Sequence, residues 1–144
     1  MLDGKWALVT GASKGVGKGI ALELAGAGAN LVINYNTDET GARETAGEVE
    51  ALGADASIVQ ANVGNAAEVE RMFAGLTRLD ILVNNAGVQT WKALLDLTEA
   101  EWDRVIDTNL KGCFLCTRHA GELMKERGGS IVNIGSGCNK TASM

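Results

Sequence analysis

Short runs of apolar residues alternate along this chain with stretches in which apolar residues recur every three or four positions. The runs predict buried β-strands, and the recurring pattern predicts amphipathic helices. Strands are expected at residues 5–10, 31–33, 57–59, 80–83 and 131–134. Helices are expected from Val16 to near Gly28, at 39–52, at 65–76, and from Thr98 to Gly128 with a break near Gly112. The pattern therefore predicts a helical segment between each pair of successive strands.

The ends and faces of these helices also carry signals. Thr98 and Glu101 have the spacing of a capping box, with Leu97 and Trp102 placed as a hydrophobic staple. Gly53 stands where a C-terminal cap glycine belongs. The residues expected to face the sheet from the first helix are Val16, Ile20 and Leu24, with Ala21 and Ala25 beside them. Those expected on the buried face of the second helix are Ala42, Ala46, Val49 and Leu52.

Strict alternation of strands and helices predicts an α/β fold. Connections of this length favour a doubly wound parallel sheet with right-handed crossovers, helices on both faces and strand order 3-2-1-4-5, which is a Rossmann-type architecture. The chain has 144 residues and no linker-like segment, so we expect one domain, 1–144, whose sheet stops after the fifth strand. A ligand crevice is expected at the carboxyl ends of the first and fourth strands.

A glycine-rich turn follows the first predicted strand, with Gly11, Gly15 and Gly17 spaced G-x-x-x-G-x-G. Where such a turn feeds a helix, the first N–H groups of the helix have no partner, and the helix dipole favours negative charge there. Glycine lets the backbone approach a ligand closely. The turn is therefore interpreted as a pyrophosphate site, with an ordinary turn as the alternative.

Composition and charge narrow the classes of function. The chain has 13 Lys and Arg against 18 Asp and Glu, a net charge of −5, and no basic run, which argues against a nucleic-acid partner. We find no signal segment and no apolar run near the ~20 residues of a membrane span. Three cysteines, an odd number, suit a reducing compartment. We therefore expect a soluble, cytoplasmic protein that does not bind membranes.

Two motifs together resemble a known family. The segments Thr10–Gly17, Thr-Gly-Ala-Ser-Lys-Gly-Val-Gly, and Asn84–Gly87, Asn-Asn-Ala-Gly, are similar to landmarks of the short-chain dehydrogenase/reductase family, in particular its 3-oxoacyl-reductase and glucose-dehydrogenase members. The resemblance covers the N-terminal portion of that family. It implies an oxidoreductase that binds a nicotinamide dinucleotide. Taken alone, Asn-Asn-Ala-Gly is also typical of a turn at the end of a strand.

The resemblance implies roles for residues at three strand ends. Gly11, Ser13, Lys14, Gly15, Val16 and Gly17 would bind the cofactor phosphates. Asn85, Ala86 and Gly87 would line the path from adenosine to nicotinamide, while Asn84 would brace the sheet. Asn62 and Val63 resemble an Asp-Val pair that contacts adenine, with asparagine in place of aspartate.

The residues that distinguish NADP from NAD are expected at the end of the second strand. An acid there would accept hydrogen bonds from a ribose 2′-hydroxyl and repel a 2′-phosphate. The chain has Asn34, Tyr35, Asn36 and Thr37, and no acid before Asp38. Lys14 adds a cation, so NADP is favoured over NAD. The alternative is that Lys14 is a solvated charge and Tyr35 a surface aromatic.

Two polar residues are candidate catalytic groups by resemblance. Asn109 matches a catalytic asparagine within a helix, and a solvent-facing asparagine is the alternative. Ser136 matches a catalytic serine that would donate a hydrogen bond to a substrate carbonyl oxygen, although serine and glycine after a strand also begin ordinary loops. Trp91 either faces a substrate or packs on the core.

Cys113, Cys116 and His119 have a spacing that suggests zinc or redox chemistry. We expect no metal, because on a helix the two cysteines share a face with Ala120 and no second pair of ligands exists. Cys138 stands too far from them to contribute.

The resemblance ends before the family's Tyr-x-x-x-Lys motif, which supplies its general acid. The sequence given stops eight residues after Ser136, and its only tyrosine is Tyr35. We therefore expect NADP-dependent interconversion of a small-molecule carbonyl and an alcohol as the family function, homo-oligomerisation of the full-length form, and a cofactor-binding fragment with little activity for this chain. The alternative is a non-catalytic nucleotide-binding or interaction module completed by a partner chain.

Overall fold

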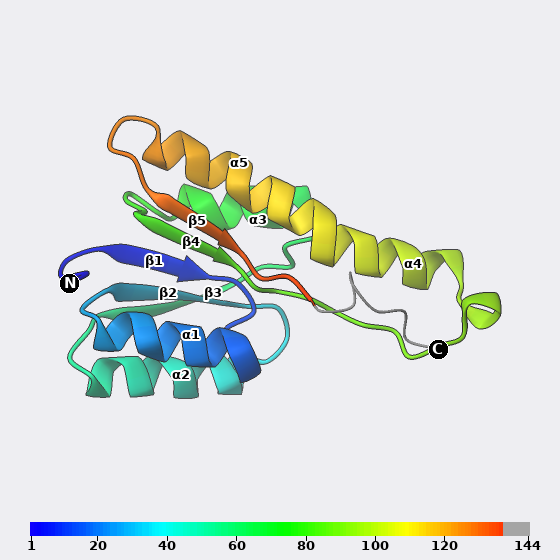
Figure 1. The fold of residues 1–144 in the computed structure, drawn as a ribbon, viewed down its shortest axis with the longest axis horizontal. Helices are drawn as coiled ribbons and strands as arrows, with labels where there is room; N and C mark the ends of the chain where they lie inside the picture. The colour runs from blue at the N-terminus through cyan, green and yellow to red at the C-terminus, as the bar shows by residue number, and fades with distance from the viewer. Residues whose placement is uncertain (137–144) are drawn as a thin grey trace.

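The computed structural model describes residues 1–136 and contains one five-stranded parallel sheet of order β3-β2-β1-β4-β5 (Figure 1). This confirms the predicted fold and strand order. The strands are β1 (Trp6–Val9), β2 (Asn30–Tyr35), β3 (Ala56–Gln60), β4 (Ile81–Asn84) and β5 (Ser130–Asn133). The helices are α1 (Gly15–Gly26), α2 (Glu39–Ala51), α3 (Ala66–Ala74), α4 (Glu99–Ile106) and α5 (Gly112–Met124).

Helices cover both faces of the sheet, with α1 and α2 on one face and α3 and α5 on the other (Figure 1). Strand β1 shows why its sequence is apolar at successive positions. Leu8 packs into the core on the α3 and α5 face, and its neighbours Ala7 and Val9 pack into the core on the opposite face. Successive strand residues point to opposite faces, so a strand covered on both sides buries all of them.

The buried face of α1 was predicted in part. Ala21 and Ala25 are buried together with Gly17, and Ile20 and Leu24 are partly buried and pack against the same core cluster. Val16, also expected on this face, is 65% exposed. The fully buried positions of α1 carry the smallest side chains, which let the helix lie close to the sheet.

The buried face of α2 was predicted in part. Ala42 and Val49 are buried as expected, together with Gly41 and Thr45. Leu52, also expected on this face, lies just past the helix and is 54% exposed.

The long helical segment between β4 and β5 is interrupted by a π-helical turn, Asp107–Lys111, which joins α4 to α5. The break was predicted near Gly112 and lies in the five residues before it. The capping box of Thr98 and Glu101 is confirmed. Of the proposed staple, Trp102 is 54% exposed. Among residues 1–136, no helix is long and apolar enough to span a lipid bilayer.

Asp80 anchors the amino ends of β1 and β4, at the edge of the sheet opposite the crevice. Its carboxylate accepts a hydrogen bond of 3.0 Å from the Trp6 N–H, and lies 2.9 Å from Arg78 Nε and 3.6 Å from Lys5 Nζ. Burial acts to raise the pKa of Asp80. The Trp6 N–H and the two cations outweigh burial, so this pKa lies below its usual 3.8.

Asp80→Asn is expected to lower the free energy of unfolding at pH 7 by about 1–3 kcal/mol, because charge-assisted hydrogen bonds are lost. A lowered folded-state pKa stabilises the protein above the unfolded-state value, and this contribution is lost as the pH falls below about 3.8. The difference in free energy of unfolding between the wild-type and variant proteins, measured with urea, should therefore be smaller at pH 3 than at pH 7. The control is Asp103→Asn on the exposed surface of α4. A difference that does not change with pH would contradict the assignment.

Candidate functional site

The glycine-rich turn between β1 and α1 is shaped by backbone contacts that exclude side chains. Gly11 and Gly15 have φ values of +63° and +60°, in the left-handed region that favours glycine. A Cβ on Gly11 would lie 2.8 Å from Ala86 Cα. A Cβ on Gly17 would collide with Asn85 Nδ2 and the Gly11 carbonyl oxygen. The turn and the Asn-Asn-Ala-Gly segment are therefore packed against each other.

Thr10 and Asn85 join the ends of β1 and β4. The Thr10 hydroxyl accepts hydrogen bonds from the N–H groups of Asn85 and Ala86, at 2.9 and 3.0 Å. Asn85 Nδ2 donates to the carbonyl oxygens of Thr10 and Gly11, at 3.0 and 3.2 Å. Sequence reasoning missed Thr10 as a functional residue. Its position as a polar residue at the end of an apolar strand was the available signal.

Asn34 has a bracing role at the end of β2. Its side chain is buried, and Oδ1 accepts a hydrogen bond of 3.2 Å from the Gly11 N–H. Its Nδ2 donates to the carbonyl oxygens of Val59 and Ala61, at 3.3 and 3.1 Å. The amide thus ties the glycine-rich turn to the end of β3, and its hydrogen-bonding groups are already engaged within the protein.

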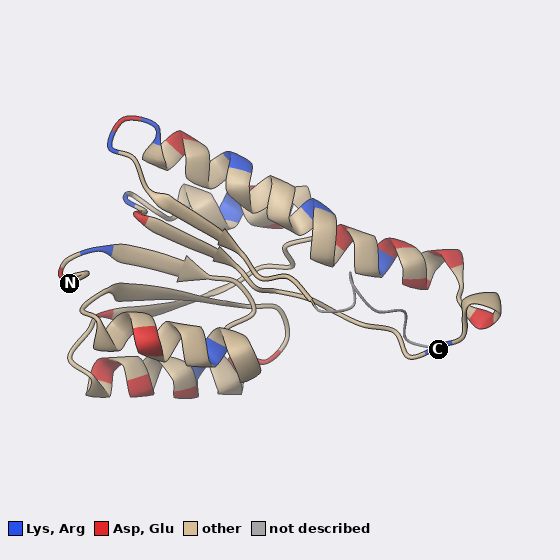
Figure 2. Cartoon of the chain, viewed as in Figure 1, with Lys and Arg blue, Asp and Glu red and all other residues tan. Residues whose placement is uncertain are grey.

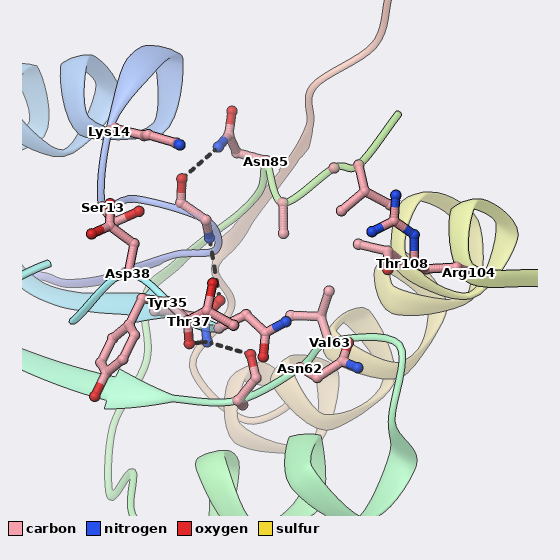
Figure 3. Close-up of a pocket in the computed structure, with 17 residues that line it drawn as sticks. Ser13, Lys14, Tyr35, Thr37, Asp38, Asn62, Val63, Asn85, Arg104 and Thr108 are labelled. Carbon is pink, nitrogen blue, oxygen red and sulfur yellow. Dashed lines mark hydrogen bonds between the residues drawn. The ribbon is translucent and has the colours of Figure 1, made fainter. Parts of the chain in front are cut away.

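A hollow of about 500 Å³ opens at these strand ends (Figure 3). Every predicted cofactor residue except Gly15, Val16 and Gly17 lines it, and those three form the first turn of α1. The predicted residues that it brings together are Gly11, Ser13, Lys14, Asn34, Tyr35, Asn36, Asn62, Val63, Asn85, Ala86 and Gly87. Lining residues that were not predicted are Thr37, Asp38, Ala61, Val88, Arg104 and Thr108. Arg104 and Thr108 come from α4 and the π-helical turn, and no local signal in the sequence placed them there.

The charged groups of the hollow come from three elements. Lys14, at the start of α1, forms no ion pair within residues 1–136, and Arg104 lies on the opposite side of the hollow (Figure 3). The Asp38 carboxylate accepts a hydrogen bond of 3.1 Å from the Gly41 N–H and caps α2. The Lys14 side chain does not cap α1, which leaves the N–H groups at the start of that helix available to an anion.

Asn109 lies in the π-helical turn and is committed to the backbone of Val88. Its Oδ1 accepts a hydrogen bond of 2.8 Å from the Val88 N–H, and its Nδ2 donates one of 2.9 Å to the Val88 carbonyl oxygen. Ser136 follows β5 and lines a second hollow together with Asn109. The two hollows share Gly87 and Val88, so the candidate catalytic residues stand next to the candidate cofactor site.

The cysteines and the histidine take structural positions. Cys113 Sγ donates to the Asn109 carbonyl oxygen at 3.3 Å, and burial raises the pKa of Cys116 to about 12. His119 stacks on Phe73, with ring centroids 5.4 Å apart. No group of side chains suited to a metal ion occurs in the described part of the chain, and Cys138 lies outside it. Trp91 is 87% exposed and lines neither hollow.

Comparison with known proteins decides the family. A family model described as short chain dehydrogenase matches residues 5–143. The chain belongs to the short-chain dehydrogenase family. The 3-oxoacyl-(acyl-carrier-protein) reductase FabG of Staphylococcus aureus strain Mu50 is 44% identical over 137 residues, which make up 92% of this chain and 56% of the relative. The chain thus spans just over half the length of this curated relative.

Two solved structures of similar fold agree with this family. The landomycin C-6 ketoreductase LanV, with bound NADP and rabelomycin, has a TM-score of 0.93 and 39% identity, with 99% of this chain and 62% of that chain covered. A short-chain dehydrogenase from Burkholderia cenocepacia J2315 in complex with NADP has a TM-score of 0.94 and 34% identity, with 99% and 60% covered.

Asn84 connects neighbouring elements of the sheet, as the resemblance to the short-chain dehydrogenase family implies. Its Nδ2 donates to Thr117 Oγ1 at 3.1 Å and to Asn133 Oδ1 at 2.8 Å. These bonds tie β4 to α5 and to β5. In this short-chain dehydrogenase, the two consecutive asparagines therefore have different partners, Asn84 toward β5 and Asn85 toward β1.

Proposed function

We propose that this chain binds NADP(H) in the first hollow and forms the cofactor-binding part of an oxidoreductase that interconverts a small-molecule carbonyl and an alcohol. The main support is the cradle at the end of β1, where Cβ atoms on Gly11 and Gly17 would collide with the neighbouring backbone. Further support comes from membership of the short-chain dehydrogenase family and from the NADP bound in two similar structures. NAD is the second choice of cofactor.

The residues of the hollow fit a dinucleotide. Backbone N–H groups of residues 13–17, at the start of α1, would hold the pyrophosphate, because the N–H groups of Gly11 and Ala12 already donate to Asn34. Asn62 and Val63 would meet the adenine ring. Lys14 and Asn36 would receive the 2′-phosphate, and the carboxylate of Asp38 is already engaged in capping α2.

Two further residues would serve the reaction itself. The nicotinamide ring of a bound cofactor supplies or accepts hydride. The Ser136 hydroxyl would donate a hydrogen bond to the substrate carbonyl oxygen and stabilise the charge that develops there. Asn109 would act as a positioning residue, because its amide holds Val88 on the wall between the two hollows.

Lys14→Gln is expected to weaken NADPH binding about tenfold or more, because hydrogen bonds to charged groups contribute about 1.5–3 kcal/mol. NADH binding should change little, since NADH lacks the 2′-phosphate. Fluorescence titration with both cofactors measures this difference. Lys18→Gln is the control, because Lys18 on α1 is paired with Glu48 and lies outside the hollow. Tighter binding of NADH than of NADPH to the wild-type chain would contradict the cofactor assignment.

The reaction has its own test. Steady-state oxidation of NADPH with a panel of ketones measures carbonyl reduction, first for this chain and then for the full-length protein. Cofactor binding without oxidation of NADPH in the full-length protein would favour a non-catalytic nucleotide-binding module. We further propose that the full-length protein is a cytoplasmic homo-oligomer. Light scattering of the full-length protein tests the oligomeric state.

A further inference from the structure

The second hollow has a volume of about 550 Å³, and most of its lining residues belong to α4 and to the segment that follows β4. Its apolar wall consists of Val88, Leu97, Trp102 and Val105. Its polar side chains are Gln89, Thr90, Lys92, Asn109 and Ser136. A concave apolar surface with a few polar groups is typical of a small-molecule site.

Thr90 is distinct from the other polar residues of this hollow. Its Oγ1 is buried and has no hydrogen-bond partner. Every other buried side-chain oxygen or nitrogen in residues 1–136 has one. Leaving such a group unpaired costs about 1–3 kcal/mol. No hydrogen bond opposes rotation of this side chain between its staggered conformations, and a rotation of about 120° in one sense moves the hydroxyl to the position of the methyl group and the methyl group to the position of Hβ. A ligand oxygen in the hollow would remove the cost.

The segment that carries Thr90 is held by side chains of α4 and of the π-helical turn. Asn109 makes two hydrogen bonds to the backbone of Val88, at 2.8 and 2.9 Å. Arg104 Nη2 lies 3.5 Å from the Gln89 carbonyl oxygen. Thr90 therefore follows two residues whose backbones are tied to α4 and the π-helical turn.

The cation of this hollow is already neutralised. Lys92 Nζ lies 2.6 Å from Glu101 Oε1. The hydrogen bond from Lys92, followed by those from Thr98, lowers the pKa of Glu101 to about 2, so this carboxyl group is ionised at neutral pH. An anionic ligand would have to displace Glu101 to reach Lys92. The hollow therefore favours an uncharged ligand.

We propose that the second hollow is the substrate compartment and that Thr90 recognises the substrate, which has an apolar skeleton and a second, uncharged oxygen in addition to the reacting carbonyl. This inference rests on the proposed function, because Ser136 places the reacting carbonyl in the same hollow. Thr90 acts by hydrogen bonding to the second oxygen, and so it selects the substrate without taking part in the chemical step.

Three matched ketones test the preference. 2-Hexanone has no second oxygen, 5-hydroxy-2-pentanone carries a hydroxyl at the corresponding end, and levulinate carries a carboxylate there. The 3- and 4-hydroxy isomers of 2-pentanone vary the spacing between the oxygens. Amide shifts in two-dimensional ¹H–¹⁵N NMR of the chain, recorded with and without NADPH, give the dissociation constants and show whether the shifts occur around the second hollow.

In the wild-type chain, at least one hydroxyketone is expected to bind about tenfold more tightly than 2-hexanone and levulinate, which corresponds to one satisfied hydrogen bond. Thr90→Val keeps the shape of the side chain and should abolish this preference while leaving 2-hexanone binding unchanged. Thr90→Ser should retain the preference. Thr77→Val, at an exposed position outside the hollow, is the control.

Several outcomes would overturn the proposal. They are a hydroxyketone preference that survives in Thr90→Val, tighter binding of levulinate, and ketone shifts away from the second hollow or absent altogether. NADPH shifts at Lys14 and Asn36 report the proposed function separately. A chain that binds the hydroxyketones but not NADPH would retract the cofactor assignment and leave the role of Thr90 as a ligand-binding group.

Discussion

Gly17→Ala is expected to abolish measurable NADPH binding at micromolar concentrations and to lower the free energy of unfolding by about 1–3 kcal/mol, the usual cost of overpacking. The new Cβ would collide with the Gly11 carbonyl oxygen and with Asn85 Nδ2. The first of these atoms belongs to the backbone of the glycine-rich turn, so relieving the collision moves the turn itself. The second belongs to the side chain that joins β1 to β4. Urea unfolding and NADPH titration measure the two effects.

Gly19→Ala is the matched control for this prediction. Gly19 lies on the same helix, and a Cβ there would meet no atom within 4 Å. Alanine has the higher helix propensity, so this variant should gain up to about 1 kcal/mol in stability and bind NADPH as the wild-type chain does. Equal effects of the two substitutions would contradict the argument from close packing.

Asn34→Asp is expected to destabilise the chain by about 3 kcal/mol or more, because a buried carboxylate without a cationic partner carries a cost of that size. Aspartate keeps the oxygen that accepts from the Gly11 N–H. It replaces the donor group by an oxygen facing the carbonyl oxygens of Val59 and Ala61, which lie 3.3 and 3.1 Å from Asn34 Nδ2. Urea unfolding at pH 7 measures the loss.

Asn36→Asp makes the same change two residues further on. Asn36 is exposed and lines the hollow, and its Oδ1 accepts a hydrogen bond from Gln60 Nε2. The variant should unfold within about 0.5 kcal/mol of the wild-type chain. It should also weaken NADPH binding relative to NADH, because a carboxylate repels the 2′-phosphate. The assignment of a bracing role to Asn34 and of cofactor selection to Asn36 would be wrong if Asn34→Asp gave a stable protein with a switched cofactor preference.

These variants probe one bracing arrangement at the carboxyl ends of the strands. Thr10, Asn34 and Asn85 each connect two neighbouring strand ends through side-chain hydrogen bonds to backbone atoms. Their bonds meet at the glycine-rich turn, where the proposed pyrophosphate would lie. The cradle is therefore held in shape by the protein itself, and a preorganised site loses less conformational entropy when it binds its ligand.

The sequence by itself determined the order of elements, the parallel sheet and the strand ends at which the first hollow lies. These follow from local patterns. Alternating apolar runs and helical stretches specify a doubly wound sheet, and glycines directly after β1 indicate a phosphate turn. All predicted cofactor residues except Gly15, Val16 and Gly17 line one hollow, because the carboxyl ends of parallel strands share one edge of the sheet. Their roles toward NADP remain predictions, as do those of Asn109 and Ser136.

Only the tertiary structure decided which side chains face one another. It left Val16 of α1 exposed, and it engaged Asn34 within the protein. It also brought Arg104 and Thr108 to the first hollow and left the hydroxyl of Thr90 unpaired in the second. The periodicity of apolar residues along the sequence indicates which positions are apolar and which element they belong to. Close packing and hydrogen-bond pairing depend on distances between segments far apart in the chain, which no local pattern contains.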